Sequence, residues 1–192
     1  MKKIGITGGI GSGKTYVASV FQSLGIPIFN ADIQAKKIMT SSRKLIKLLK
    51  EEFGNDIYKD SDLNKEKLAS IVFSNSDKLQ KLNSLVHPIV KEEFNNWCKK
   101  QTSPYVIKEA AILFESNSHI GLDAVICVSN PLDLRMKRLL KRDNSSEKEI
   151  KKRIKNQMSQ EVKEKLSDYI IVNDEKDLLL PKIIKFHKEL LS

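Results

Sequence analysis

KKIGITGGIGSGKTYVASVFQSLG, residues 2–25, is the stretch that decides the fold of this chain. Its start, Lys3–Thr7, is a short apolar run typical of a buried strand. Its end has a stop signal at Gly25, preceded by apolar residues at helical spacing, namely Val17, Val20, Phe21 and Leu24. Between these two parts, residues 8–15 match the pattern G-x-x-x-x-G-K-[ST]. The stretch therefore predicts a strand, a phosphate-binding loop and a helix, in that order.

The chemistry of such a loop follows from its residue types. Glycines let backbone N–H groups turn inward around phosphate oxygens, and the following helix adds the positive end of its dipole. Lys14 is expected to reach the β- and γ-phosphates of a nucleoside triphosphate, and the Thr15 hydroxyl to ligate Mg²⁺. The predicted triphosphate contacts are Gly9, Ile10, Gly11, Ser12, Gly13, Lys14 and Thr15. The alternative is a glycine-rich turn with an incidental lysine, which the flanking strand and amphipathic helix disfavour.

Four more short strands are predicted downstream, at residues 27–29, 105–109, 124–128 and 169–172. They alternate with helical stretches, a pattern typical of a parallel sheet covered on both faces. We therefore expect an α/β fold of the P-loop NTPase kind, with a five-stranded parallel sheet flanked by helices. The residues between the second and third strands show helical patterning and no good strand, so a helical subdomain is expected there.

The composition is that of an ordinary globular protein. The chain has 192 residues, 40% hydrophobic and 30% charged, enough for one domain whose core needs no disulfide or structural metal. Cys98 and Cys127 lie far apart without partners at metal-ligand spacing, so we expect buried thiols in a reducing cytosol. No apolar stretch approaches the ~20 residues of a membrane-spanning helix, and the N-terminus lacks a signal-peptide pattern. We expect a cytoplasmic protein without membrane contact.

Positive charge is concentrated in one segment. The formal net charge is +10, and residues 135–155 hold ten Lys or Arg against three Asp or Glu, including four of the five arginines. One helix is predicted to start with Asn130 as its cap and Pro131 as its first residue, and a second at the capping box Ser146-x-x-Glu149. Two helices joined by a polar turn would be able to move as a hairpin.

Two functions compete for this basic segment. A site for single-stranded nucleic acid needs aromatic stacking surfaces, and residues 135–155 contain no Phe, Tyr or Trp. A lid that closes over a nucleotide fits better, because guanidinium groups contact phosphates in a bidentate fork. Several of the lysines are expected to form only a solvated helical face.

Two acidic residues are expected at the carboxyl edge of the sheet, where ligands bind in doubly wound folds. Asp32 either accepts a proton from a hydroxyl that attacks the γ-phosphate or caps a helix that begins at Ile33. Glu109 either holds a magnesium-bound water or caps a turn. A GTPase is disfavoured, because the one approximate N-K-x-D sequence, at residues 64–67, lacks the acid. No long apolar strand ends in paired acids, as it would in a motor ATPase.

Together these features resemble the dephospho-coenzyme A kinase family from end to end. Besides the phosphate loop, the resemblance rests on Asn30-Ala31-Asp32, Leu82-Asn83 with His87-Pro88, Ile112-Leu113-Phe114-Glu115, Arg142-Asp143 and Asn156-Gln157. The chain departs from the family pattern at three places. Asn30 replaces the first Asp of Asp-Ala-Asp, Ala111 with Ile112 replaces Pro-Leu, and Asn64 replaces a frequent arginine.

The resemblance implies an ATP-dependent kinase that phosphorylates the ribose 3′-hydroxyl of dephospho-coenzyme A, the last step of coenzyme A biosynthesis, with Mg²⁺ as cofactor. It implies a single P-loop kinase domain with a core of residues 1–30, 102–134 and 161–192. It further implies a helical coenzyme A-binding insertion at residues 31–101 and a lid at residues 135–160.

By matching position, the resemblance also implies roles for single residues. Asp32 would be the catalytic base, Lys14 and Arg142 would contact ATP and assist catalysis, and Thr15 would contact magnesium. Asp32, His87 and Glu115 would line the substrate side. Without the resemblance, His87 is interpreted as a helix-terminal histidine before Pro88.

The resemblance implies a small-molecule substrate and no nucleic-acid partner. We expect the protein to be a monomer or a weak homo-oligomer. Two other interpretations stay open on the residues alone. One is another small-molecule P-loop kinase, of the adenylate or nucleoside type, and the other is a nucleic-acid-binding ATPase.

Overall fold

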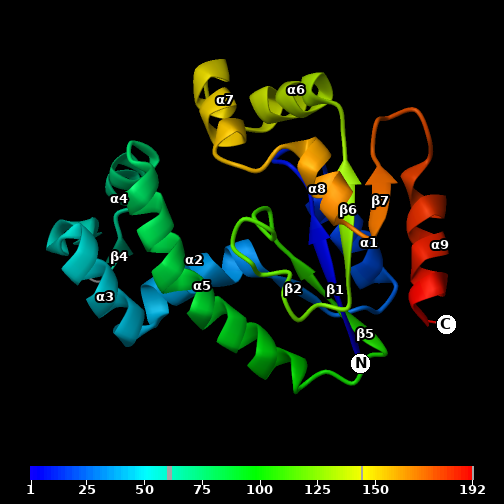
Figure 1. Ribbon diagram of the computed structural model, residues 1–192, viewed down its shortest axis with the longest axis horizontal. Coiled ribbons are helices and arrows are strands. Elements are labelled where there is room, and N and C mark those ends of the chain that lie inside the picture. The colour runs from blue at the N-terminus through cyan, green and yellow to red at the C-terminus, as the bar shows by residue number, and fades with distance from the viewer. Residues whose placement is uncertain (60–61, 144, 192) are drawn as a thin grey trace. The chain divides into compact units, whose positions relative to one another are not determined.

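The computed structural model describes residues 1–59, 62–143 and 145–191. The chain divides into two compact units (Figure 1). The sheet unit comprises Met1–Asn30 and Lys100–Ser192, and the helical unit comprises Ala31–Lys99. The chain therefore leaves the sheet unit after its second strand and returns before its third.

Five parallel strands form the sheet of the sheet unit. Their spatial order is β2-β5-β1-β6-β7, so that the first strand lies in the centre. Their bounds are β1 Lys2–Thr7, β2 Ile28–Asn30, β5 Tyr105–Glu109, β6 Ala124–Ser129 and β7 Tyr169–Val172. The predicted α/β fold and all five predicted strands are confirmed, with ends that differ by no more than one residue.

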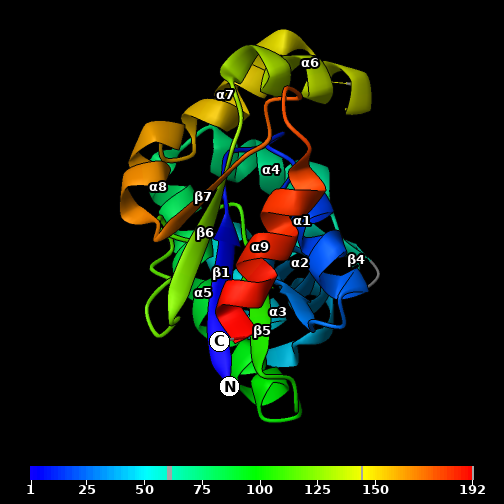
Figure 2. The same cartoon turned by 90° about the vertical axis from the view of Figure 1, so that its right-hand side faces the viewer.

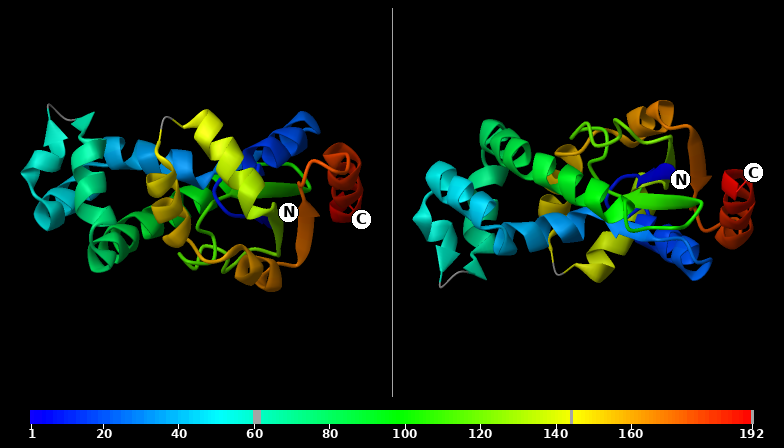
Figure 3. Two further views of the ribbon diagram at one scale, coloured as in Figure 1. Left: turned by 90° about the horizontal axis from the view of Figure 1, so that it is seen from above. Right: turned by 90° about the horizontal axis from the view of Figure 1, so that it is seen from below.

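Helices cover both faces of this sheet and its carboxyl edge. α1 (Lys14–Ser23) and α9 (Leu179–Leu191) pack together on one face, and α8 (Gln160–Leu166) lies against β6 on the other (Figure 2). α6 (Leu132–Arg142) and α7 (Glu147–Lys155) lie beyond the carboxyl ends of the strands. The left view of Figure 3 looks onto this edge and shows α6 lying across it. In the described part of the chain, none of the helices combines the length and apolar character that crossing a bilayer requires.

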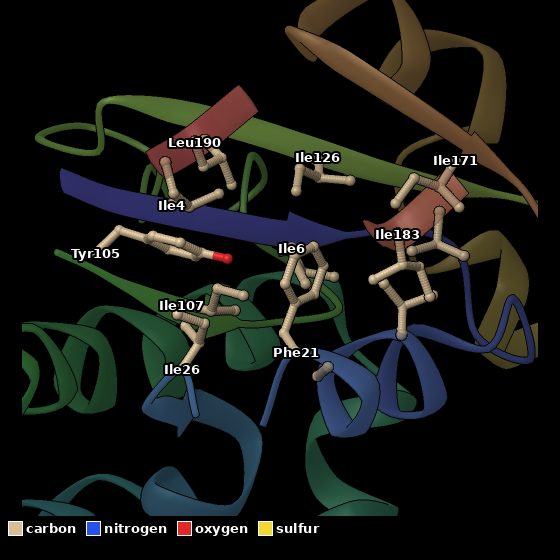
Figure 4. Packing of buried hydrophobic residues seen from close by; sticks show 13 residues of the cluster. Ile4, Ile6, Phe21, Ile26, Tyr105, Ile107, Ile126, Ile171, Ile183 and Leu190 are labelled. Atoms are coloured by element: carbon tan, nitrogen blue, oxygen red, sulfur yellow. The ribbon is translucent and has the colours of Figure 1, made fainter. Parts of the chain in front are cut away.

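The core of the sheet unit lies between the sheet and the helices α1 and α9 (Figure 4). Its largest contributors are Ile4, Ile6, Phe21, Ile26, Tyr105, Ile107, Ile126, Ile171, Ile183 and Leu190. The rings of Phe21 and Tyr105 meet edge to face with centroids 6.4 Å apart, and the Tyr105 hydroxyl bonds His187 Nδ1 at 2.7 Å. Burial of each large side chain contributes roughly 1.5–3 kcal/mol. The strand and helix on either side of the phosphate loop are therefore fixed by the buried core of the unit.

The helical unit is built around one long helix. Its elements are α2 Ala31–Ser41, α3 Arg43–Phe53, the 3₁₀ turn η1 Asn55–Ile57, β3 Tyr58–Lys59, β4 Asp62–Leu63, α4 Lys65–Phe73 and α5 Ser76–Cys98. α5 packs against α2, α3 and α4. The prediction of a purely helical segment was wrong at one place, since the short strands β3 and β4 pair antiparallel. Asn64, at the position of a frequent family arginine, caps α4 by accepting a hydrogen bond from the Lys67 amide at 3.0 Å.

Pro88 does not end its helix, so the interpretation of His87 as a helix-terminal residue was wrong. α5 runs unbroken from Ser76 to Cys98, with Pro88 inside it. A proline costs a helix one backbone hydrogen bond and a steric clash, about 3 kcal/mol. Burial of Val86, Val90 and Phe94 on either side of Pro88 offsets that cost, because these residues anchor both halves of the helix in the unit.

Two predicted helix starts have different outcomes. The capping box is confirmed: the Ser146 hydroxyl accepts from the Glu149 amide, and the Glu149 carboxylate accepts from the Ser146 amide. The prediction for the preceding helix was wrong by one position, because α6 begins at Leu132 with Pro131 as its cap. Asn130 instead donates its side-chain amide to the carbonyl of Asn173, beyond β7. The Asn130 side chain thus bonds a residue distant in sequence instead of capping the helix that follows it.

Candidate active site

The glycine-rich loop joins β1 to α1 at the carboxyl edge of the sheet. Gly13 is the residue before α1 and has a φ of 94°, a left-handed conformation that costs glycine nothing. A Cβ atom at Gly13 would also collide with the side-chain amide of Asn173. Inside the loop, the Ser12 amide donates to the Gly9 carbonyl at 3.1 Å. The loop is thus held around the N-terminus of α1, which is a site of positive potential.

A cavity of about 200 Å³ opens in front of this loop. It is lined by Gly11, Gly13, Lys14, Thr15, Arg138, Leu139 and Arg142. The first four residues come from the loop and the start of α1, and the last three come from α6. Three cationic side chains and a helix N-terminus therefore surround one small hollow, an arrangement suited to a polyanion.

Most of the predicted triphosphate contacts meet at this cavity. Gly11, Gly13, Lys14, Thr15 and Arg142 line it, whereas Gly9, Ile10 and Ser12 belong to the same loop but are not among the lining residues. Lys14 is 8% exposed, and its Nζ donates to the Gly9 carbonyl at 3.2 Å. Its ammonium group is therefore held against the loop and close to the hollow.

Three side chains at the carboxyl edge form a hydrogen-bonded row. The Thr15 hydroxyl donates to Glu109 Oε1 at 2.7 Å, and the Asn30 side-chain amide donates to Glu109 Oε2 at 2.6 Å. Glu109 ends β5, is 4% exposed and lies opposite Asn30 in the pairing of β2 with β5. Both of its oxygens are thus fixed beside the phosphate loop. Among the described residues, no three or more His, Cys, Asp or Glu side chains are grouped so that they would hold a metal ion by themselves.

The arginines and lysines of residues 135–155 differ in their exposure. The lysines all face solvent, namely Lys137, Lys141, Lys148, Lys151, Lys152 and Lys155. Arg135 is buried, and Arg138 and Arg153 are half-buried. Arg142 is exposed like the lysines. The predicted solvated face therefore contains all six lysines, while three of the four arginines of this segment are at least partly buried.

Arg142 is the last residue of α6 and is bound to its neighbour. Its Nε donates to Asp143 Oδ1 at 2.7 Å, and Arg153 of α7 donates to Asp143 Oδ2, also at 2.7 Å. The two guanidinium groups hold the pKa of Asp143 well below its ordinary value, at about 2, since both stabilise the carboxylate. Asp143 therefore ties the end of α6 to α7 with one permanent negative charge.

Glu115 lies in the sheet unit and takes part in an internal ion pair. Its Oε1 accepts from Lys163 Nζ at 2.8 Å and from the Met158 amide at 2.8 Å. The Lys163 side chain is fully buried and also donates to the Ala111 carbonyl at 2.6 Å. Lys163 thus holds two positions of the turn segment after β5, namely Glu115 and Ala111, where this chain lacks the family's usual proline.

The other two predicted site residues belong to the helical unit. Asp32 is the second residue of α2, which begins at Ala31 rather than Ile33, so the alternative of Asp32 as helix cap was wrong. His87 lies in the middle of α5. Neither belongs to the sheet unit that carries the phosphate loop.

Sequence reasoning missed several residues that shape the site. Arg138 lines the cavity and is paired with Glu175 at 2.8 Å; its guanidinium also bonds Asn173. Asn173 in turn donates to the Ser12 carbonyl at 2.9 Å. The concentration of arginine in one segment was the one signal for Arg138, whereas nothing local marks Asn173 or Glu175.

Comparison with known proteins places these features in context. A family model described as dephospho-CoA kinase matches residues 2–178. A dephospho-CoA kinase of Bacteroides fragilis is 37% identical over 184 residues, which span 95% of this chain and 90% of that protein. A crystal structure from Thermus thermophilus matches with a TM-score of 0.88 at 30% identity, over 100% of this chain and 98% of that one. A dephospho-CoA kinase structure from Campylobacter jejuni shares the fold, with a TM-score of 0.62 at 24% identity over 98% of this chain and 97% of that one.

Proposed function

Because this chain belongs to the dephospho-CoA kinase family, it is an ATP-dependent kinase, and we propose that it converts dephospho-CoA to CoA. The γ-phosphate of ATP is transferred to the ribose 3′-hydroxyl of the acceptor, with ADP as the second product. This reaction is the final step of coenzyme A biosynthesis.

The observation that carries the proposal is the cavity shared by the phosphate loop and α6. ATP presents three linked phosphates, and this hollow offers loop amides, Lys14 and two arginines. Phosphoryl transfer needs little covalent chemistry from the protein, because positioning and charge neutralisation supply most of the rate enhancement. Lys14 and Arg142 would neutralise charge on the transferring group, and the loop residues Gly9 to Thr15 would hold the β- and γ-phosphates.

Magnesium is proposed as the cofactor. Mg²⁺ prefers oxygen ligands and usually keeps several waters. The Thr15 hydroxyl and the Glu109 carboxylate fit this preference, since both are oxygen donors, adjacent at 2.7 Å and beside the phosphate loop. Thr15 would contact the ion, and Glu109 would hold a water of its shell. When bound, the ion neutralises negative charge on the triphosphate.

Asp32 is proposed as the catalytic base. It stands two residues after Asn30, whose side chain bonds Glu109 at the end of β5. As the acceptor 3′-oxygen forms its bond to the γ-phosphorus, the bond from that phosphorus to the β–γ bridging oxygen breaks and the hydroxyl proton passes to the Asp32 carboxylate. Residues 31–101 are proposed to bind dephospho-CoA, with His87 and Glu115 on the substrate side.

Residues 135–160 are proposed to act as a lid, and residues 1–30, 102–134 and 161–192 as the core. A kinase must exclude water from the γ-phosphate, and closure of a cationic hairpin over ATP would do so. The Asp143 link between α6 and α7 supports movement of the two helices as one body. We also propose a cytoplasmic monomer or weak homo-oligomer that needs neither nucleic acid nor a membrane.

One assay tests the reaction directly. Purified protein, ATP and Mg²⁺ are incubated with dephospho-CoA, and CoA and ADP are quantified, with AMP and adenosine as control acceptors. We expect CoA in amounts equal to ADP and little phosphorylation of either control. Preference for AMP or adenosine would overturn the acceptor assignment, and strong stimulation of ATP hydrolysis by RNA or DNA would favour a nucleic-acid-dependent enzyme.

A further inference from the structure

Two glutamine side chains bind the backbone of the phosphate loop from outside it. The Gly9 amide donates to Gln160 Oε1 at 2.9 Å, and the Ile10 amide donates to Gln157 Oε1 at 2.9 Å. Gln160 is the first residue of α8, and Gln157 lies between α7 and α8. These two loop amides thus bond to glutamine side chains, whereas Gly11, Gly13 and Thr15 line the cavity.

The peptide between Gly9 and Ile10, whose N–H bonds Gln157, also positions Lys14. The Gly9 carbonyl accepts from Lys14 Nζ at 3.2 Å and from the Ser12 amide at 3.1 Å. Gly9 thus connects Gln160 on one side with the ammonium group and the loop interior on the other. A shift of this peptide would move Lys14 relative to the cavity.

The opposite side of the same turn is held by α6. Arg135 Nε donates to the Ile10 carbonyl at 3.0 Å, and a side chain at Gly9 would collide with the Arg135 guanidinium. Arg135 and Gln160 are the first and last residues of the segment proposed as the lid. The loop turn at Gly9 and Ile10 therefore forms hydrogen bonds with residues at both ends of the proposed lid segment.

The glutamines are themselves firmly anchored. The Gln160 side-chain amide donates to Glu164 Oε1 at 2.9 Å and to the Val128 carbonyl of β6 at 3.4 Å. Next to Gln157, the Met158 amide is held by Glu115, the partner of buried Lys163. The Gln160 carbonyl oxygen is therefore held in one orientation by its own side-chain amide, and the backbone next to Gln157 is fixed by Glu115.

We infer that Gln157 and Gln160 are positioning residues for phosphoryl transfer. Gln157 fixes the Gly9–Ile10 peptide and, through the Gly9 carbonyl, the place of Lys14, and Gln160 fixes the adjoining Gly8–Gly9 peptide. This inference rests on the proposed kinase function. Catalytic groups tolerate little displacement, and a misplacement of about 1 Å costs roughly 10²-fold in rate. Loss of either acceptor would leave a partly buried N–H without a partner and let the turn rotate.

The test uses Gln157→Leu and Gln160→Leu, which keep most of the side-chain volume and remove the acceptor. The matched control is Gln22→Leu, at an exposed position of α1 in the same unit. We expect kcat to fall roughly tenfold or more in each test variant, with KM for dephospho-CoA within about twofold of the wild type. Gln157→Glu retains a side-chain oxygen that accepts from the Ile10 amide, so it should recover kcat to within about threefold of the wild type.

Hydrogen exchange of the Gly9 and Ile10 amides, measured with neither ATP nor acceptor, gives a second readout. Exchange at Ile10 should rise at least about tenfold in Gln157→Leu and stay unchanged in Gln22→Leu. The inference is overturned by unchanged kcat and unchanged exchange in folded leucine variants, or by a Gln157→Glu variant as impaired as Gln157→Leu. If Gln160→Leu fails to fold, the comparison of Gln157→Leu with Gln157→Glu tests the inference by itself.

Failure of the proposed function is distinguishable from failure of this inference. A wild-type protein that makes no CoA from dephospho-CoA contradicts the proposed reaction, whereas the exchange experiment needs no acceptor and still reports on the loop. Slow ATP hydrolysis in the absence of acceptor then replaces CoA formation as the kinetic readout.

Discussion

The Thr15 hydroxyl donates a 2.7 Å hydrogen bond to Glu109, across 94 residues of sequence. The bond links the start of α1 to the end of β5, so a phosphate-loop residue and a buried carboxylate face each other at the carboxyl edge of the sheet. A hydroxyl that donates its proton to a carboxylate keeps its lone pairs for another partner. This pair is therefore the part of the site best prepared for a hard cation.

Replacement of Glu109 by glutamine should lower the apparent affinity of the enzyme for Mg²⁺. Glu109→Gln keeps the shape and an oxygen that accepts from Thr15, but it removes the negative charge. We expect the free Mg²⁺ concentration for half-maximal rate to rise about tenfold or more, because the outer-shell partners of a metal contribute that much. Initial rates at fixed ATP and varied Mg²⁺ measure the shift. Glu66→Gln, at an exposed position of α4, is the control, and an equal shift in both variants would contradict a magnesium role for Glu109.

Lys14→Ala should remove phosphoryl transfer and leave a folded protein. Lys14 neutralises charge on the transferring group, and its Nζ donates to the loop carbonyl of Gly9. We expect turnover to fall by about 10² or more, with a melting temperature close to that of the wild type. Lys137→Ala, which removes an exposed lysine of α6, should be nearly silent. Near-normal turnover in Lys14→Ala would refute the assignment of the loop.

Asp32→Asn should separate catalysis from nucleotide binding. The amide preserves size while it removes the proton acceptor, so turnover should drop roughly 10²-fold or more. ATP binding, followed by titration with a non-hydrolysable analogue, should survive. Turnover within a few-fold of the wild type would mean that another group takes the hydroxyl proton.

The guanidinium of Arg142, and not only its charge, should matter for the lid. Arg142→Lys keeps the cation but loses the fork that contacts two oxygens at once, so we expect kcat to fall at least about tenfold, or ~1.4 kcal/mol. Lys141→Ala, at the preceding exposed residue, should have a much smaller effect.

Protease sensitivity gives an independent measure of the same lid. If ATP draws the hairpin closed, cleavage within residues 135–155 should slow when ATP is added. An Arg142→Lys variant with unchanged kcat, together with equal cleavage with and without ATP, would contradict the lid role and mean that the segment is only a solvated basic face.

The Cys127 thiol should be unreactive in the folded protein. Burial raises its pKa to about 11, so at pH 8 only on the order of one thiol in a thousand is ionised. The folded pKa lies above the unfolded one, so protonation favours the folded state, and this contribution to stability is lost as pH rises from about 8.5 toward 11. A thiol-reactive dye should label neither cysteine at pH 8 until denaturant is added. Rapid labelling of the native protein would contradict the buried environment.

The sequence alone determined the features that depend on neighbouring residues. Lys3–Thr7, the glycine loop and the helix after it follow from apolar runs, glycine's access to left-handed backbone and helical periodicity. The Ser146–Glu149 capping box is equally local, since its two hydrogen bonds join residues three positions apart. These features depend on residues within one turn or one strand, so they can be predicted without knowing what the segment packs against.

Only the tertiary structure decided which distant groups meet. Pro88 stays inside α5 because burial on both sides of it outweighs the local cost, and Asn130 leaves its expected cap for a partner beyond β7. Gln157 reaches an amide 147 residues away in the phosphate loop, and Lys163 reaches Glu115 across 48 positions. These contacts arise where segments converge at one edge of the sheet, and the free energy that selects them comes from burying and pairing polar groups there. No local pattern encodes that convergence, because it depends on how the whole chain packs.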